Sequence, residues 1–233
     1  MIFFREQRLS PEQFMAFARR IGKPIEYPFV KGIAGFPEII EVKKLEHEKV
    51  NFGGIWHSDT AYLDEPPMAS MLLAREVPPY GGDTLFANMY LAYEALSEGM
   101  KRLLDGLVAV NASSKADATR TREDRIRADG GEAKKQYVAE HPVVRTHPET
   151  GRKGLYFDPG KILYIDGLEA AESDALIDEL TERMIQPEGQ YTHRWRKGDI
   201  VIWDNRCSYH KAAGDYPPEE DRIHWRVSIK ERT

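Results

Sequence analysis

Cysteine is almost absent from this sequence: Cys207 is the only one among 233 residues. A single cysteine excludes a disulfide within the chain and any zinc site built from several cysteines. It also favours a reducing compartment, so we expect a cytoplasmic protein. No run of 18 apolar residues occurs, and the sequence therefore predicts no membrane-spanning helix. The amino terminus becomes charged at Arg5, which is unlike a secretory signal.

An excess of basic residues is also missing. Lysine and arginine together number 33, against 38 aspartates and glutamates, and the formal net charge is −5. Nucleic-acid-binding domains usually carry a basic surface, so general nucleic-acid binding is not expected. Hydrophobic residues make up 41% and charged residues 30%, and no internal repeat is found. This composition is typical of a globular protein, and we expect one domain over residues 1–233.

Short apolar segments separated by proline and glycine predict many strands and few helices. Ser10 before Pro11, with Gln13 three positions later, is typical of a capping box that begins a helix, which Gly22 would end. Residues 2–4 are expected to form a short buried strand. The other predicted elements are strands at 69–76, 199–204 and 223–229, one or two helices in 88–106 and an amphipathic helix at 170–185. The expected fold class is α+β, mainly β.

Two segments are ambiguous by pattern. Residues 69–76 match a strand or a helix, and the Pro-Pro and Gly-Gly pairs that follow favour a strand. Residues 112–139 are unusually polar for a compact domain and indicate a mobile lid, a loop or an exposed helix inserted in the fold. Residues 141–158 return to strand character, with a turn at 148–151.

His57 and Asp59 are the first residues that suggest a metal site. In a strand, side chains two positions apart lie on the same face, so one imidazole and one carboxylate would point to the same place. That pair suits a metal ion with mixed nitrogen and oxygen ligands, although a histidine hydrogen-bonded to a neighbouring aspartate is the alternative. His210 follows the apolar segment 199–204. His210 can be the third metal ligand only if the fold brings it close to His57. Otherwise it is a packing or surface residue.

Arg222 and Arg226 lie four positions apart at the last predicted strand. Guanidinium groups bind carboxylates through two hydrogen bonds, whereas surface arginines here would be solvated or paired with acids such as Glu219. Two histidines and one carboxylate hold Fe(II) on three positions and leave three open, which suits a chelating 2-oxo acid and dioxygen. The two arginines would then bind the distal acid groups.

These residues stand in segments that resemble a known family. The segments are FFREQRLSPEQFMAFARRIGKP at 3–24, WHSDTAYLDEPP at 56–67, PPYGGDTLFANMYLAYEAL at 78–96, HPVVRTHPETGRKGLYF at 141–157, KGDIVIWDNRCSYHKAAGDY at 197–216 and RIHWRVSI at 222–229. In order and sequence the chain resembles the taurine dioxygenase group, with the phenoxyacetate dioxygenases, of Fe(II)- and 2-oxoglutarate-dependent oxygenases. The resemblance implies a distorted jelly roll (double-stranded β-helix) with helices packed outside.

The resemblance also implies roles for individual residues. His57, Asp59 and His210 match the iron ligands of the family. Thr84 matches the threonine that hydrogen-bonds the distal carboxylate of 2-oxoglutarate, and Arg222 matches the arginine that forms a salt bridge with it. The remaining histidines are expected to be structural or exposed: His47, His141, His147, His193 and His224.

The substrate side of the resemblance is less complete. Arg226 matches an arginine that holds the anionic end of the substrate in sulfonate-using members, and Trp203 matches a tryptophan near the iron. Tyr27 stands where taurine users have a histidine, and a tyrosine carries no charge at neutral pH. A small anion, such as a sulfonate, a sulfate ester or a carboxylate, is therefore expected, with taurine itself in doubt. The Asp59 carboxylate favours oxygen transfer over halogenation, because halogenating relatives replace it with a small residue.

The reaction implied is hydroxylation of a small-molecule substrate by Fe(II), 2-oxoglutarate and dioxygen, with release of succinate and CO2. Desaturation or oxidative rearrangement on the same scaffold is one alternative, and a jelly-roll binding protein without turnover is another.

Family members usually have some tens of residues before the segment at Met1, so a short member or a mis-set start is expected. A homodimer or homotetramer is also expected, and dimerisation could cover the sheet edge left exposed.

Overall fold

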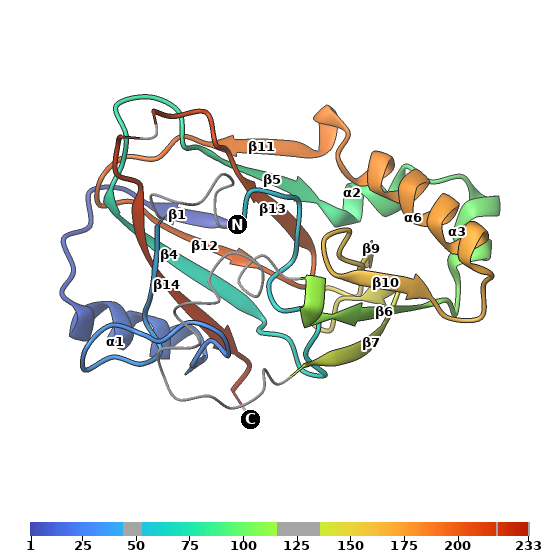
Figure 1. The fold of residues 1–233 in the computed structure, drawn as a ribbon, viewed down its shortest axis with the longest axis horizontal. Helices are drawn as coiled ribbons and strands as arrows, with labels where there is room; N and C mark the ends of the chain where they lie inside the picture. Colours follow the sequence, from blue (N-terminus) through green and yellow to red (C-terminus); the bar gives the residue numbers. More distant parts are fainter. Residues whose placement is uncertain (44–52, 116–135, 218, 233) are drawn as a thin grey trace.

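The computed structural model describes residues 1–43, 53–115, 136–217 and 219–232. These residues form a mainly β structure with few helices, as expected from the sequence, and each named strand pair is antiparallel (Figure 1). The largest sheet has the order β1-β12-β4-β14-β2, with β3 also paired to β14. Its strands are β1 (Ile2–Phe4), β2 (Lys23–Ile25), β3 (Ile40–Val42), β4 (Ala69–Glu76), β12 (Ile200–Asp204) and β14 (Ile223–Lys230).

Three smaller sheets complete the β structure of the described residues. One has the order β11-β5-β13, a second the order β10-β6-β7, and the third is the hairpin β8-β9. Their strands are β5 (Thr84–Asn88), β6 (Val108–Ala112), β7 (Val138–Pro142), β8 (Val144–Thr146), β9 (Lys153–Leu155), β10 (Ile162–Ile165), β11 (Gln190–His193) and β13 (Ser208–Ala212). The sheet β11-β5-β13 carries Thr84 and His210.

The ambiguous segment 69–76 is strand β4, which lies at the centre of the largest sheet. Its apolar side chains are buried on both faces: Met71 and Leu73 pack toward helix α1, whereas Leu72 packs with Phe86 and Trp203. A strand covered on both faces has a continuous apolar run, which is why periodicity alone could not separate it from a helix.

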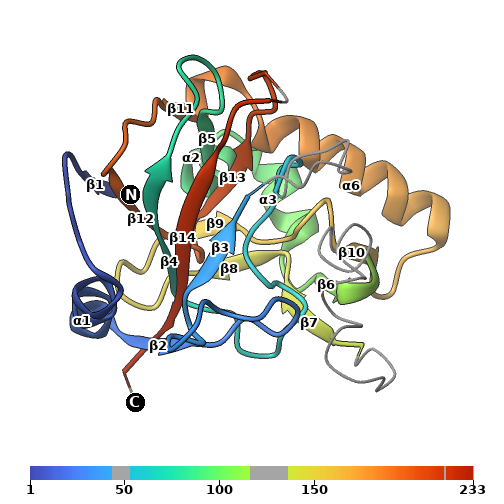
Figure 2. The ribbon, with the colours of Figure 1, turned by 60° about the vertical axis from the view of Figure 1, so that its left-hand side comes forward.

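Helix α1 (Pro11–Ile21) confirms the predicted capping box. The Ser10 hydroxyl accepts from the Gln13 N–H, the Gln13 side chain accepts from the Ser10 N–H, and the helix ends at Gly22. Phe14 and Met15 are fully buried against the largest sheet. Figure 2 shows α1 at one side of the β structure and α6 (Ala170–Met184) at the other. The predicted helices in 88–106 are α2 (Met89–Glu94) and α3 (Glu98–Leu104), which pack in the same core cluster as α6.

The prediction of a buried strand at residues 2–4 is half wrong. These residues do form β1, but their side chains are exposed, with Ile2 at 56% and Phe3 at 43%. The reason is position: β1 lies at the edge of the sheet and pairs only with β12 in the described chain. Phe4 meets the ring of Phe17, and Arg5 lies 4.8 Å above the Phe3 ring, so these aromatics are only partly covered.

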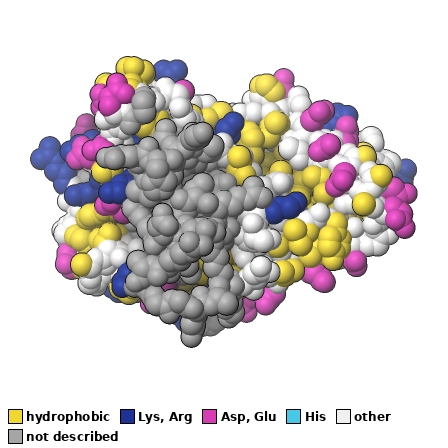
Figure 3. All heavy atoms as spheres, viewed as in Figure 1, with side chains coloured by type: hydrophobic (Ala, Val, Ile, Leu, Met, Phe, Trp, Pro, Cys, Tyr) yellow, Lys and Arg dark blue, Asp and Glu magenta, His cyan; other side chains and the backbone are white. Residues whose placement is uncertain are grey.

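The polar segment 112–139 lies mostly outside the described residues. Its beginning is the end of β6 followed by a 3₁₀ turn at Ser113–Lys115, and its last residues belong to β7. Residues 116–135, the larger part of the predicted lid at 112–139, lie outside the described residues, so the lid stays a prediction. Across the described chain, the helices are too short or too polar to cross a bilayer. On the face drawn in Figure 3, lysine and arginine side chains stand among aspartates and glutamates.

Candidate metal and cosubstrate site

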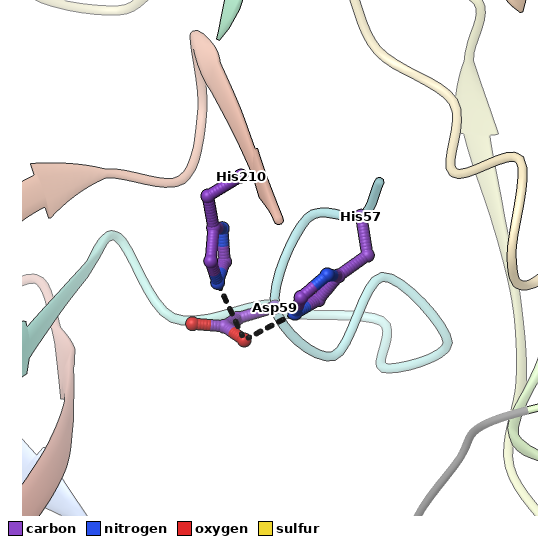
Figure 4. Close-up of side chains that lie close together, drawn as sticks. All are labelled: His57, Asp59 and His210. Atoms are coloured by element: carbon purple, nitrogen blue, oxygen red, sulfur yellow. Dashed lines mark ion pairs between the residues drawn. The ribbon is translucent and has the colours of Figure 1, made fainter. Parts of the chain in front are cut away.

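The fold brings His57, Asp59 and His210 together. His57 forms an isolated β-bridge with His210, in which each backbone N–H donates to the carbonyl of the other residue at 3.0 Å. The chain turns directly after His57, so Asp59 reaches the site from a turn and not from the strand that the sequence suggested. Both imidazoles point toward the Asp59 carboxylate in Figure 4.

The geometry of the three donor groups suits a single metal ion. The distance from Asp59 Oδ1 to His57 Nε2 is 3.7 Å, and that from Asp59 Oδ1 to His210 Nε2 is 3.8 Å. The ligand atoms all lie within 4.8 Å of one another. Two imidazoles and one carboxylate are the donor set of non-haem Fe(II) oxygenases. The residues present therefore fit the iron centre that the sequence resemblance implies.

The protonation of the two histidines also suits metal binding. Burial, with the neighbouring His210, lowers the pKa of His57 to about 3, and burial lowers the pKa of His210 to about 4. Both imidazoles are thus neutral at pH 7. The Nδ1 of His57 lies 2.7 Å from the carbonyl oxygen of Ile55 and must carry the proton to donate to it. Its Nε2 lone pair is then directed at the site, as a metal ligand requires.

Two side chains hold the Asp59 carboxylate, one at each oxygen. The Ser70 hydroxyl donates to Oδ2, and Arg226 Nη2 lies 2.9 Å from Oδ1. Burial by itself would raise the pKa of Asp59, but Arg226 and the two histidines outweigh it and keep that pKa well below its usual value. The carboxylate is therefore ionised, with Oδ1 on the side of the histidines.

Thr84 and Arg222 meet at a second place in the same pocket. Arg222 Nη2 donates to Thr84 Oγ1 at 3.2 Å, and Arg222 Nε donates to the Gly82 carbonyl at 2.7 Å. Trp195 Nε1 also donates to Thr84 Oγ1, at 2.9 Å. Since Oγ1 accepts two hydrogen bonds, its own proton is available to a third group. Gly82 has a φ of +67°, and a Cβ there would stand 3.1 Å from Arg222 Cδ, so glycine lets the guanidinium stem pack against the turn.

Arg222 is a buried cation with no carboxylate at ion-pair distance among the described residues, although Asp83 and Asp215 lie near enough to raise its pKa. It is 7% exposed and forms no ion pair with any described residue. Burial lowers its pKa to about 10, which still leaves it charged at neutral pH. An unpaired buried charge is costly unless a ligand of opposite charge compensates it. This position therefore suits the carboxylate of a bound acid.

The residues expected on the substrate side lie around Arg226 and His210. The Arg226 guanidinium stands 5.1 Å from the centre of the Tyr27 ring, and the Tyr62 hydroxyl donates to that of Tyr27 at 3.4 Å. Trp203 is buried, with its ring centre 4.6 Å from that of His210. The structure thus brings all eight predicted site residues into one neighbourhood. It adds that Arg226 already forms an ion pair with Asp59, which the sequence did not suggest.

The pocket lies between the largest sheet and the sheet β11-β5-β13. Side chains on one face of β14 alternate with core side chains on the other, so Arg226 faces the pocket while Val227 faces α1. In β12, Trp203 faces the pocket in the same way, and Ile202 faces α1. The pocket lining includes His57, Leu72, Thr84, His210, Arg222 and Arg226.

Several residues that support the site were missed by sequence reasoning. Trp203 Nε1 donates to Asn205 Oδ1 at 2.9 Å, and Asn205 Nδ2 donates to Ser70 Oγ at 3.1 Å, which in turn donates to Asp59. Trp195, which fixes the Thr84 hydroxyl, was also missed. Asn205 lies in the segment 197–216, one of those that resemble the family. That position was the one sign in the sequence that Asn205 supports the site. Ser70 sits in an ordinary apolar strand and gave none.

A second group of possible metal ligands is held by hydrogen bonds within the protein. His147, Asp204 and Cys207 have donor atoms within 4.8 Å of one another. The His147 Nδ1 accepts from two backbone N–H groups, its Nε2 lies 3.0 Å from Asp204 Oδ2, and Arg206 holds both oxygens of Asp204. Burial also raises the pKa of the Cys207 thiol. The described histidines outside the predicted triad, among them His147, are largely buried, and His47 lies outside the described residues.

Comparison with known proteins agrees with this geometry. The sequence model described as "Taurine catabolism dioxygenase TauD, TfdA family" matches residues 1–228. The chain belongs to the TauD, TfdA family. It is therefore a member of a family of 2-oxoglutarate-dependent dioxygenases, and the resemblance inferred from its sequence is confirmed.

Relatives in the TauD, TfdA family act on different anions. The chain is 33% identical to an alpha-ketoglutarate-dependent sulfate ester dioxygenase of Pseudomonas putida, covering 98% of this chain and 76% of the relative. It is 36% identical to the alpha-ketoglutarate-dependent 2,4-dichlorophenoxyacetate dioxygenase of Cupriavidus pinatubonensis, covering 91% and 78%. An alkylsulfatase of Acinetobacter baylyi is 33% identical, with 98% and 72% covered.

Solved structures of the TauD, TfdA family share the fold. A crystal structure of a taurine dioxygenase from Burkholderia xenovorans superposes with a TM-score of 0.80 at 34% identity, covering 97% of this chain and 75% of that one. A structure titled AAD-2 in complex with Mn(II) and N-oxalylglycine gives a TM-score of 0.79 at 27% identity, covering 99% and 82%.

Proposed function

We propose that this protein is an Fe(II)- and 2-oxoglutarate-dependent dioxygenase that hydroxylates a small anionic organic substrate and releases succinate and CO2. The observation that carries the proposal is the convergence of three donors, His57 Nε2, His210 Nε2 and Asp59 Oδ1, beside two buried arginines. The fold proposed for this arrangement is the distorted jelly roll of the family, with the site between its two facing sheets.

The two histidines and Asp59 would hold iron, which when bound would couple decarboxylation of 2-oxoglutarate to oxidation of the substrate. Arg222 and the free proton of the Thr84 hydroxyl would bind the distal carboxylate of 2-oxoglutarate. Trp195 would orient that proton, because its indole N–H already donates to Thr84 Oγ1. Burial of Arg222 excludes water and strengthens its attraction for the carboxylate.

Arg226 would bind the anionic end of the substrate, with Tyr27 beside it. Sulfate esters and phenoxyalkanoates are the first classes to test, because they appear in the names of relatives in the TauD, TfdA family. Sulfonates are the third substrate class to test. Arg226 also contacts Asp59, so the same side chain would contact both the substrate anion and a ligand of the metal.

The test is succinate production with Fe(II), 2-oxoglutarate and each substrate class, together with product analysis. We expect succinate formation in step with a hydroxylated product for at least one anionic class. A product desaturated or rearranged instead would favour the alternative chemistry on this scaffold, and no turnover of any class would favour a binding protein. Homo-oligomerisation and the cytoplasmic location stay predictions.

A further inference from the structure

The turn Phe157–Lys161 carries a buried ion pair that the proposed chemistry does not use. Lys161 Nζ lies 2.7 Å from Asp158 Oδ2, with Asp158 fully buried and Lys161 8% exposed. A buried ion pair contributes little net stability, because desolvation offsets its attraction. Stability alone therefore does not explain why this ion pair is buried at this turn.

Both members of this pair bind the backbone of Ser58, the residue between His57 and Asp59. The Ser58 N–H donates to Asp158 Oδ2 at 3.0 Å, and Lys161 Nζ donates to the Ser58 carbonyl at 2.7 Å. The Ser58 hydroxyl donates to the Asn205 carbonyl at 3.0 Å. Every polar group of Ser58 is thus held by a residue distant in the sequence.

The same turn also contacts the segment of the third donor. Tyr209, the residue before His210, donates its hydroxyl to the Phe157 carbonyl. Two hydrogen bonds close the turn itself: Asp158 Oδ1 accepts from the Gly160 N–H at 2.9 Å, and the Asp158 carbonyl accepts from the Lys161 N–H at 2.9 Å. One short turn therefore touches both segments that bring the three donors together.

Gly160 packs directly against the Ile55 side chain. A Cβ at Gly160 would stand 2.5 Å from the Ile55 Cδ1 atom, two residues before His57. The Ile55 carbonyl in turn fixes the His57 tautomer. Ile55 is 41% exposed, so its side chain has room to turn aside for a residue at position 160.

We infer that the Asp158–Lys161 pair is a positioning clamp, which fixes the backbone at Ser58 and thereby the spacing of His57 and Asp59 for metal binding. Lys161 is the decisive member, because among the residues that the structure describes it is the one that donates to the Ser58 carbonyl. The inference rests on the proposed metal centre. Partners that orient metal ligands typically change metal affinity 10- to 100-fold when they are removed, and we expect about that loss without the Lys161 ammonium.

The test uses Mn(II), measured by titration under electron paramagnetic resonance. Lys161→Met is compared with Lys161→Arg, which keeps a cationic donor, and with Lys115→Met as the matched control. Lys115 also donates to a backbone carbonyl, that of Ile162 at 2.6 Å, without a contact to Ser58. If Lys161→Met does not fold, the double variant Asp158→Asn with Lys161→Met replaces it, because it leaves no unpaired charge in the core.

We expect Lys161→Met, or the double variant, to weaken Mn(II) binding by about 10- to 100-fold and to change its spectrum. Lys161→Arg should recover part of the affinity, and Lys115→Met should bind Mn(II) like the wild type. Wild-type affinity and spectrum in folded Lys161→Met, or an equal loss in Lys115→Met, would overturn the clamp alone. A wild type that binds Mn(II) no better than His210→Ala would overturn the proposed metal centre, and the clamp with it.

Discussion

His57 and His210 exchange both backbone hydrogen bonds at 3.0 Å, and their ring centres stand 4.1 Å apart. The two donors thus belong to one antiparallel contact between segments far apart in the chain. Their spacing depends on backbone pairing as well as on side-chain rotamers. A metal site built on such a contact is pre-organised, which favours affinity because little order must be gained on binding.

Replacing Arg222 with methionine should weaken 2-oxoglutarate binding. Loss of a buried charged partner typically costs about 2–5 kcal/mol, so we expect the KM for 2-oxoglutarate to rise on the order of 30-fold or more. The KM for the substrate should change little. Steady-state kinetics with each reactant varied in turn measures both, and a KM for 2-oxoglutarate within twofold of wild type would refute this role for Arg222.

Replacing Arg226 with alanine should affect the other reactant. We expect the KM of the anionic substrate to rise at least about tenfold, because a charge-assisted contact is lost, while that of 2-oxoglutarate stays close to wild type. Arg226→Lys, which keeps the charge but not the planar group, is the matched control and should lie between the two. Equal increases in both KM values would show that Arg226 acts through Asp59 and not on the substrate.

The buried histidines predict that the metal-free protein loses stability in acid. The pKa values of His57 and His210 fall to about 3 and about 4 on folding, and that of His224 falls well below its usual value through burial and Arg222. The unfolded chain, with histidine pKa values of about 6.5, therefore binds more protons below that pH. Stability is full above pH 6.5 and falls as the pH drops toward 4, by up to about 1.4 kcal/mol per pH unit for each histidine.

Urea unfolding between pH 7.5 and 5.5 measures this effect, since most carboxyl groups stay ionised in that window. His224→Leu should flatten the dependence of the free energy of unfolding on pH, because it removes one of the titrating groups. Leucine suits this position, because neither ring nitrogen of His224 has a hydrogen-bond partner among the described residues. A free energy of unfolding that stays constant over this range would contradict the neutral state assigned to these histidines.

Local signals in the sequence were reliable where neighbours along the chain decide the structure. Ser10 and Gln13 predicted the start of α1 because a capping box is made within one turn. The alternating faces of β12 and β14 follow from strand geometry, and they place Trp203 and Arg226 in the pocket. The family resemblance supplied the rest of the candidate site.

Contacts between distant segments could not be predicted in this way. Ser70 gives no sign that it donates to Asp59, and Lys161 gives none that it holds Ser58, because sheet pairing and turn placement create both contacts. The exposure of β1 likewise depends on its position at the sheet edge and not on its apolar residues. The long-range part of the site was therefore visible only in three dimensions.

An anaerobic titration of the protein with Fe(II) and 2-oxoglutarate, followed in the visible spectrum, tests whether the proposed metal centre forms. We predict that the weak charge-transfer band of chelated 2-oxoglutarate appears with the wild type and is absent with His210→Ala. A correctly folded wild type that gives no band would contradict the assignment of His57, Asp59 and His210 as the iron site.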